Sequence, residues 1–258
     1  MIGLQFFIAR PAPAAISVYP VLLELSVSKE GQLQGSLSVT NEGAEAAEIE
    51  VQPEYWLKSS PVINGQAIEI GSWLNLEPKN FRLKPAEKKE VKYSIRAPSG
   101  LAGEIMAQVY FADVTKKESA AVNVISRVGV GLYVSVKETQ KISAKIDRIN
   151  ITKEGKEIKF EVVVENLGNV HLRPKGKLVI QDSQNRTIKE LETQYGWPVF
   201  PATKYSYHAL CKDTDIGKGQ YGVQASIYYG NLYEQKADRT DEKKAGFNID
   251  KDGRIKIK

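Results

Sequence analysis

The sequence contains one cysteine, Cys211, and two histidines, His171 and His208, in 258 residues. A single cysteine cannot form a disulfide within the chain, and a thiolate-based zinc site needs partners that this chain lacks. The two histidines are far apart in sequence, so a catalytic or metal centre built on imidazole is not expected. The sequence therefore predicts a protein without a metal or an organic cofactor.

Catalytic motifs are missing as well. No G-x-S-x-G, H-E-x-x-H, P-loop or G-x-G-x-x-G pattern is present. Residues 250–253 match the start of a calcium loop but lack the later acidic ligands, which indicates a hairpin turn. The sequence contains no run of about 18 apolar residues, so no membrane-spanning helix is expected. The net charge of +5 is spread along the chain and is weak evidence for nucleic acid. We expect a protein that is not an enzyme.

Short alternating segments and turns make up the rest of the chain. The segment "QLQGSLSVTN" alternates through Leu33, Leu37 and Val39, and "EIKFEVVVEN" alternates through Ile158 and Phe160. Such period-2 patterns, with turns every 8–12 residues and no sustained helical period, are typical of β-sandwiches. The predicted fold is all-β, with two tandem immunoglobulin-like sandwiches over residues 16–138 and 139–258. The charged stretch 235–244 is expected to be an exposed loop.

The two predicted domains repeat a turn and a corner. Asn41-Glu42-Gly43 in the first domain corresponds to Asn166-Leu167-Gly168 in the second, each after an alternating strand. Asn and Gly both tolerate left-handed backbone angles at tight turns. A Pro-Ala corner, at residues 85–86 and again at 201–202, precedes a later strand in each domain. The repeat supports two sandwiches of related design.

Residues 1–15 are interpreted as a leader. An apolar stretch from Gly3 to Ala9 is followed by small residues near Ala15, as at the end of a secretory signal. This predicts a periplasmic or otherwise extracytoplasmic protein. The alternative is a disordered leader on a cytosolic protein, which the single cysteine by itself would favour.

Several motifs together resemble the PapD-like periplasmic pilus chaperones. They are "VYPVLLEL", "GSLSVTNEG", "LEPKNFRLKPAEKKEVKYSIRAP", a long strand ending "GLYVSV", and "VENLGNVHLRPKGKLVIQD". The resemblance implies binding of pilus or surface-protein subunits by an exposed edge strand, with an outer-membrane usher as a further partner. That strand would be residues 120–136. Its subunit-binding residues would be Val122, Val124, Val128, Val130 and Leu132. The alternative is that these side chains only fill the core of the first domain.

The sequence departs from the family at its carboxylate anchor. Family members hold the subunit's C-terminal carboxylate with an Arg on the first strand and a Lys on the last, and these positions fall on Leu22 and Gly131 here. Arg127 is a possible substitute anchor. The missing cations favour a second hypothesis, a structural or adhesive envelope protein that binds glycan, peptidoglycan or other surface proteins. Trp56, Trp73, Trp197 and Tyr195 could line a carbohydrate site, although core packing is the simpler interpretation.

Overall fold

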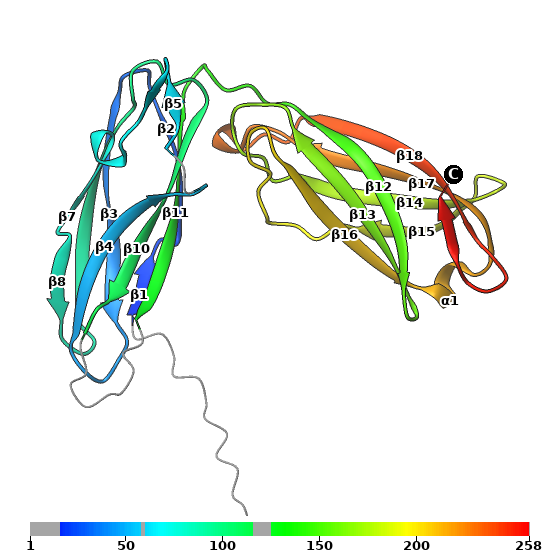
Figure 1. Cartoon of the computed structure of the whole chain (residues 1–258), viewed down its shortest axis with the longest axis horizontal. Coiled ribbons are helices and arrows are strands. Elements are labelled where there is room, and N and C mark those ends of the chain that lie inside the picture. Colours follow the sequence, from blue (N-terminus) through cyan, green and yellow to red (C-terminus); the bar gives the residue numbers. More distant parts are fainter. Residues whose placement is uncertain (1–15, 58–59, 116–124, 258) are drawn as a thin grey trace, which may run out of the picture. The chain divides into compact units, whose positions relative to one another are not determined.

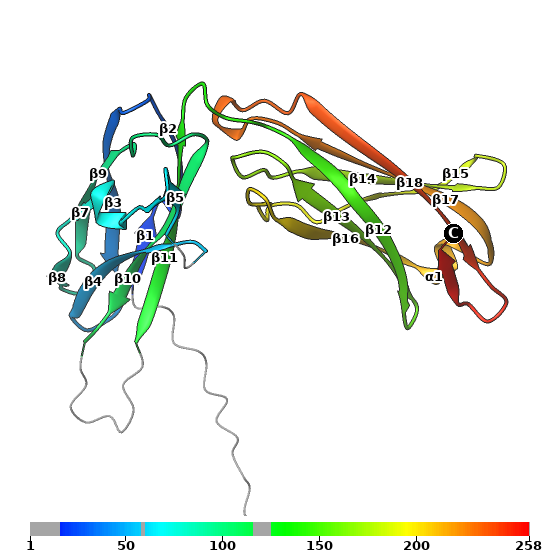
Figure 2. The same cartoon turned by 45° about the horizontal axis from the view of Figure 1, so that its top comes forward.

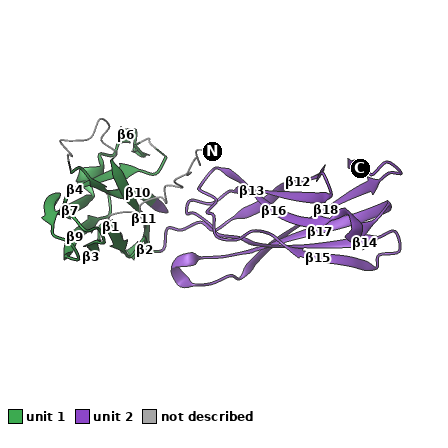
Figure 3. Cartoon of the chain, turned by 90° about the horizontal axis from the view of Figure 1, so that it is seen from below, with its two compact units in different colours: residues 1–101, 105–137 green, residues 102–104, 138–258 purple. Residues whose placement is uncertain are grey.

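The computed structural model describes residues 16–57, 60–115 and 125–257 of the chain. These residues form two compact units (Figures 1 and 3). The first unit ends at Lys137, one residue before the boundary expected from the sequence. Residues 102–104 are grouped with the second unit, which otherwise begins at Glu138.

The first unit is a β-sandwich. Its strands are β1 (Ile16–Tyr19), β2 (Leu22–Val27), β3 (Gln32–Asn41), β4 (Ala47–Tyr55), β5 (Val62–Ile63), β6 (Gln66–Ala67), β7 (Leu74–Glu77), β8 (Asn80–Leu83), β9 (Lys88–Arg96), β10 (Glu104–Asp113) and β11 (Ser126–Val136), with a 3-10 turn at Ile70–Ser72. One sheet has the order β1-β3-β9-β7 and the other β2-β11-β10-β4-β8, and β5 and β6 form a small hairpin. Alternate residues such as Ile105, Val109 and Phe111 of β10 are buried in the core.

The second unit is also a β-sandwich. Its strands are β12 (Ala144–Glu154), β13 (Glu157–Asn166), β14 (Lys175–Asp182), β15 (Thr187–Glu192), β16 (Lys204–Lys212), β17 (Gly219–Tyr229), β18 (Arg239–Ile249) and β19 (Ile255–Ile257), with helix α1 (Asp213–Ile216) and a 3-10 turn at Leu232–Glu234. The sheets have the orders β12-β13-β16 and β15-β14-β17-β18-β19. Phe160 and Phe247 meet edge to face in the core, with ring centroids 5.8 Å apart. The all-β fold with two tandem sandwiches is confirmed.

The first unit begins with a largely apolar segment, residues 16–27, whose two strands belong to different sheets. β1 pairs antiparallel with β3, whereas β2 pairs parallel with β11 in the other sheet. Pro20 lies between the two strands, and a proline cannot donate a hydrogen bond to a continuing ladder. The change of sheet therefore occurs at the residue that interrupts the pairing.

The repeated turn is built around a fully buried asparagine in the first unit. Asn41 Nδ2 donates to the carbonyl oxygens of Glu45 (2.8 Å) and Leu83 (3.2 Å), and its Oδ1 accepts from the Gly43 N–H (2.9 Å). The Ala86 N–H donates to the Asn41 carbonyl (3.0 Å). Ala86 has a φ of 59°, the left-handed region, at the Pro-Ala corner.

Asn166 repeats this arrangement in the second unit. Its Nδ2 donates to the carbonyls of Val170 and Val199, both at 2.8 Å, and its Oδ1 accepts from the Gly168 N–H at 2.8 Å. Ala202, with a φ of 57°, donates to the Asn166 carbonyl. The sequence repeat thus corresponds to the same hydrogen-bonded turn in both units.

The prediction of an exposed loop holds for residues 235–238, which are exposed and lie outside the strands, and is wrong for residues 239–244. Residues 239–249 form β18, which pairs with β17 along its whole length. Asp241 Oδ2 accepts from the Ile146 N–H (2.7 Å), and Lys243 Nζ donates to the Asp147 carbonyl (2.7 Å). The charges therefore serve as hydrogen-bonding partners for the backbone of β12, in addition to meeting solvent.

Candidate functional site: the open edge of β11

β11 has two halves with different neighbours. Residues 131–136 pair in parallel with β2, with Gly131 opposite Leu22 and Val136 opposite Val27. This half is buried on both faces, and Tyr133 and Ser135, on the face away from the core, are as buried as Leu132. Figure 2 shows β2 beside this end of β11. The second half of the predicted edge strand is thus already paired within its own chain.

The first half, Ser126–Val130, lies beyond the end of β2. No strand of the described residues pairs with it on that side. The Gly131 N–H donates to the Val21 carbonyl (3.0 Å), and the backbone groups of alternate residues point to the same side of a strand. The N–H and C=O groups of Arg127 and Gly129 therefore face the side where the described sheet ends. Backbone groups without a partner among the described strands are a template for another strand.

The residues predicted to bind a subunit occupy different environments. Val122 and Val124 lie outside the described residues. Val130 and Leu132 are buried in the core of the first unit, and Leu132 is opposite Leu23 in the paired half. Val128 is half-buried and packs against the core from the open half. Within the described residues, Val128 and Val130 are the predicted residues on the open part of the strand.

Arg127 lies on the outer face of the sheet with partners of its own. Its guanidinium lies 3.9 Å from the centroid of the Tyr110 ring, and its Nη1 is 3.3 Å from Glu54 Oε1. Both charged side chains are substantially exposed, so this ion pair contributes little to stability. An incoming carboxylate would compete with Glu54 for Arg127.

The two positions aligned with the family's anchor are direct neighbours in the ladder. Leu22 is opposite Gly131, and neither is a cation. A Cβ on Gly131 would lie 3.1 Å from Leu22 Cδ1 and 3.2 Å from Trp56 Cζ3. The Trp56 ring packs against Tyr133, with centroids 5.4 Å apart. An apolar surface therefore stands at the position of the carboxylate anchor.

Sequence reasoning missed Trp56 and Tyr110 as parts of this edge. Tyr110 approaches Gly129 in the same manner as Trp56 approaches Gly131, because a Cβ on Gly129 would lie 3.0 Å from Tyr110 Cε1. A glycine inside a strand often marks close approach of another group. The pair Gly129 and Gly131 was the available signal, but it does not say which side chain covers it.

The most enzyme-like cluster of the described residues is fully buried. His171 Nδ1 lies 2.6 Å from Glu104 Oε2, and the Tyr233 hydroxyl donates to the same oxygen. All three residues are grouped with the second unit, although Glu104 is also the first residue of β10. The side chains of His171 and Glu104 have no exposed area. A substrate cannot reach a pair without solvent access, so we interpret it as a structural polar network.

The other reactive groups give no catalytic arrangement in the described part of the chain. Burial raises the pKa of the Cys211 thiol to about 11, which keeps it protonated and unreactive near neutral pH. No group of three or more His, Cys, Asp or Glu side chains in the described ranges could hold a metal ion. None of the helices described there is long and apolar enough to cross a membrane.

The aromatic residues considered for a carbohydrate site have separate roles. Trp73 is buried in the first core and donates from Nε1 to the Tyr55 hydroxyl (3.0 Å). Trp56 belongs to the edge described above. Trp197 and Tyr195 are exposed in the second unit, where Lys175 Nζ lies 5.1 Å from the centroid of the Tyr195 ring. The core-packing interpretation thus holds for Trp73 and not for the exposed pair.

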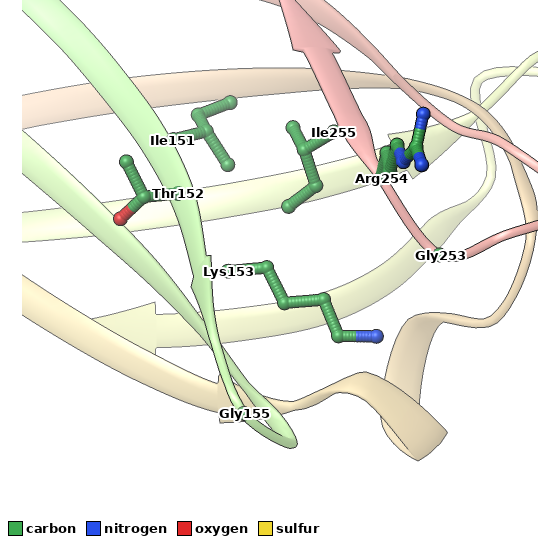
Figure 4. Close-up of a pocket in the computed structure, with 7 residues that line it drawn as sticks. All are labelled: Ile151, Thr152, Lys153, Gly155, Gly253, Arg254 and Ile255. Carbon is green, nitrogen blue, oxygen red and sulfur yellow. The ribbon is translucent and has the colours of Figure 1, made fainter.

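An open hollow of about 500 Å³ lies at one end of the second unit (Figure 4). It is lined by residues from two segments, which are Ile151, Thr152, Lys153 and Gly155 in the first and Gly253, Arg254 and Ile255 in the second. Lys153 Nζ is 2.9 Å from Asp213 Oδ2, and this hydrogen bond holds the pKa of the Asp213 carboxyl below its usual range. The lysine is therefore committed to an internal ion pair.

Comparisons with known proteins return structures but no sequence families. No family model and no curated protein matches the chain. Similar solved structures include the class 5 fimbriae chaperone CfaA, at 16% identity and a TM-score of 0.49, over 94% of this chain and 98% of that chain. A chain from a chaperone–tip adhesin complex of CFA/I fimbriae has 15% identity and the same TM-score and coverage. A chain from the complex of Salmonella enterica SafA pilin with the SafB chaperone has 11% identity and a TM-score of 0.44, over 88% of this chain and 95% of that chain.

These structures come from fimbrial chaperone systems. Identities of 11–16% concern the fold alone and leave function to the residues of this chain.

Proposed function

We propose that this protein is a non-enzymatic, chaperone-like protein that binds extended segments of other polypeptides by strand addition at β11. The observation that carries the proposal is the half-paired edge. Residues 126–130 extend beyond β2, and the backbone groups of Arg127 and Gly129 face the side where the described sheet ends. Main-chain hydrogen bonds to such an edge give affinity without requiring any one partner sequence.

The side chains of this half suit a guest strand with alternating apolar residues. Val128 and Val130 point toward the core, and Arg127 and Gly129 point to the outer face. A strand added beside them would place its own alternate residues next to the same core. The guest we propose is therefore a β-strand from a protein that lacks one of its own edges. A pilus or surface-protein subunit is the class that the family resemblance implies.

An extracytoplasmic location belongs to the same proposal. Residues 1–15 resemble the end of a secretory signal. Subunits of surface structures must be held away from one another before assembly, because exposed strand edges associate readily. An outer-membrane usher would then be the second partner, receiving the subunit from this protein.

The test compares two substitutions at one residue of the edge. Arg127→Pro removes an N–H that faces the open side, whereas Arg127→Ala removes the same side chain and keeps the N–H. Each protein is co-expressed with subunit-like proteins encoded beside its own gene, and complexes are isolated through a tag on the subunit. We expect the wild type and Arg127→Ala to hold a subunit and Arg127→Pro to bind about tenfold more weakly, because a hydrogen bond is lost and the ring obstructs the guest.

A second variant covers the case in which the proline disturbs the fold. Val128→Lys places an ammonium on the half-buried inner face, where a guest strand would bury it. Thermal unfolding of both variants checks that the first unit remains folded. Capture by folded Arg127→Pro and Val128→Lys at the level of Arg127→Ala would overturn the proposal, as would the absence of any complex with the wild type.

A further inference from the structure

The open half of β11 ends at a defined point. Pairing with β2 begins where the Gly131 N–H donates to the Val21 carbonyl, and Leu22 is opposite Gly131. A strand that pairs with residues 126–130 on this side cannot continue past that point, because β2 occupies the backbone groups beyond it. Whatever residue ends the guest strand here must lie against Val21 and Leu22.

The surface at this point is apolar and partly exposed. Val21 is 62% exposed and Leu22 is 40% exposed. Trp56 approaches the same glycine from the neighbouring side and packs on the buried ring of Tyr133. The close approach of Leu22 and Trp56 is possible because Gly131 has no side chain. We call the surface formed by Leu22 and Trp56 around Gly131 the end site.

The charges near the end site do not favour an anion. The nearest charged residue along β2 is acidic, since Glu24 is opposite Tyr133 in the ladder. The nearest cation along β11 is Arg127, four residues before Gly131, and Glu54 already pairs with it. With the described residues of β2 and β11 as its neighbours, a terminal carboxylate would therefore lose water here without gaining a cation, which is unfavourable. An apolar side chain would instead gain by covering Leu22 and Trp56.

We propose that the end site binds a large apolar side chain at the end of the guest strand and does not act as a carboxylate anchor. The inference rests on the proposed strand addition, and it names the feature of the guest that this protein selects. The occupant is a leucine-like or aromatic residue of a partner polypeptide. The register of the guest is then set by apolar contact at the point where β2 begins.

The experiment uses synthetic peptides of alternating Val and Thr, about nine residues long, an ordinary strand length. One series carries Leu or Asp at the C-terminal end with blocked termini, and a matched peptide ends in a free carboxylate. A second series carries the same residues at the N-terminal end, because an added strand can run in either direction. Affinity for the full-length protein is measured by calorimetry. We expect the Leu-ended peptide of one series to bind about tenfold more tightly than its Asp-ended and free-carboxylate counterparts.

Two variants of the protein sharpen the result. Leu22→Arg should remove the preference for the Leu-ended peptide and raise the affinity for the free carboxylate, because it places a cation at the end site. Leu210→Arg makes the same change at an exposed leucine of the second unit and should leave every affinity unchanged. A folded Leu22→Arg protein that keeps the wild-type preference would overturn the inference.

The outcomes separate the two proposals. Equal binding of all peptides by the wild type, abolished by Arg127→Pro, would retain strand addition and overturn the end site. Failure of every peptide to bind would count against strand addition itself. A dimer in sedimentation that Leu22→Arg dissolves would show that a second copy occupies the end site, which would overturn the proposed partner.

Discussion

The two units contain the same buried asparagine turn, yet they differ in the charged side chains along their sheet edges. In the second unit, side chains of β18 bond to the backbone of β12, with Asp241 on Ile146 and Lys243 on Asp147. In the first unit, the open half of β11 carries one charged side chain, Arg127, among serine, glycine and valine residues. Charged side chains along an edge discourage pairing with other chains, and their scarcity permits it.

The comparison shows that two copies of one fold can keep the same interior turn and differ at their edge strands. The interior turn is constrained in both units, because a buried asparagine must satisfy the same carbonyls at the same corner. The edges are not constrained in this way, since a strand margin can be charged or apolar without changing the core. Function in this chain is therefore expected at a margin of the first unit.

The largest effect is expected from removing the shared turn. Asn41→Ala and Asn166→Ala should each lower the free energy of unfolding of their own unit by about 2–4 kcal/mol, because two carbonyls and one N–H lose their partner. Urea unfolding of each variant measures the cost. The exposed Asn75, replaced by alanine, is the control and should change stability little. If one of the two substitutions lowered the free energy of unfolding by less than about 1 kcal/mol, the two turns would not be equivalent.

An intermediate effect is expected from making the second unit resemble the first. The double variant Asp241→Val/Lys243→Val removes the side chains that bond to β12 and leaves apolar residues beside that strand. We expect a loss of about 1 kcal/mol in stability and faster self-association in light scattering. The control is Glu242→Val/Lys244→Val, which removes the same charges from residues whose side chains do not bond to β12. Equal self-association of the two double variants would contradict the assignment.

The smallest effect is expected from acid. Five carboxyl groups of the second unit have a pKa held below its usual range, and they are Asp147, Glu161, Asp182, Asp213 and Asp250. Hydrogen bonds are the first cause of each shift, from Lys204 for Asp147 and from the Arg186 backbone for Asp182. A group with a depressed folded pKa stabilises the fold above its unfolded pKa, and that stability is lost as the pH falls through the folded value.

The second unit should therefore lose stability below about pH 4, while the first unit changes less. Amide signals of both units, followed by NMR at decreasing pH and increasing temperature, measure this difference. Asp182→Asn should flatten the acid dependence of the second unit. Parallel acid sensitivity of the two units would contradict this prediction.

The fold could be predicted because its signals are local. Alternation marked the inward residues of β3 and β13, and the Asn-x-Gly repeat marked the two turns. The charged stretch 235–244 misled because a run of exposed charges was interpreted as a loop, whereas residues 239–244 belong to β18. Its role depends on β12, about a hundred residues earlier in the chain, and no local pattern contains that neighbour.

The candidate site could be predicted only in outline. Alternation identified Val128, Val130 and Leu132 as one face of a strand, but not where β2 would cover its margin. Pro20 was the local sign that the first apolar run would divide between sheets. Trp56 and Tyr110 reach the strand from other segments, so their positions over Gly131 and Gly129 follow from tertiary packing alone.

The division of the first apolar run has a mechanical consequence. One short segment, residues 16–27, is bonded to one layer of the first sandwich through β1 and to the other layer through β2. The segment connects the two layers, so neither sheet can separate at this margin without straining its connection to the other. Local opening of the first unit is then a concerted event, and its rim stays closed until both layers yield together.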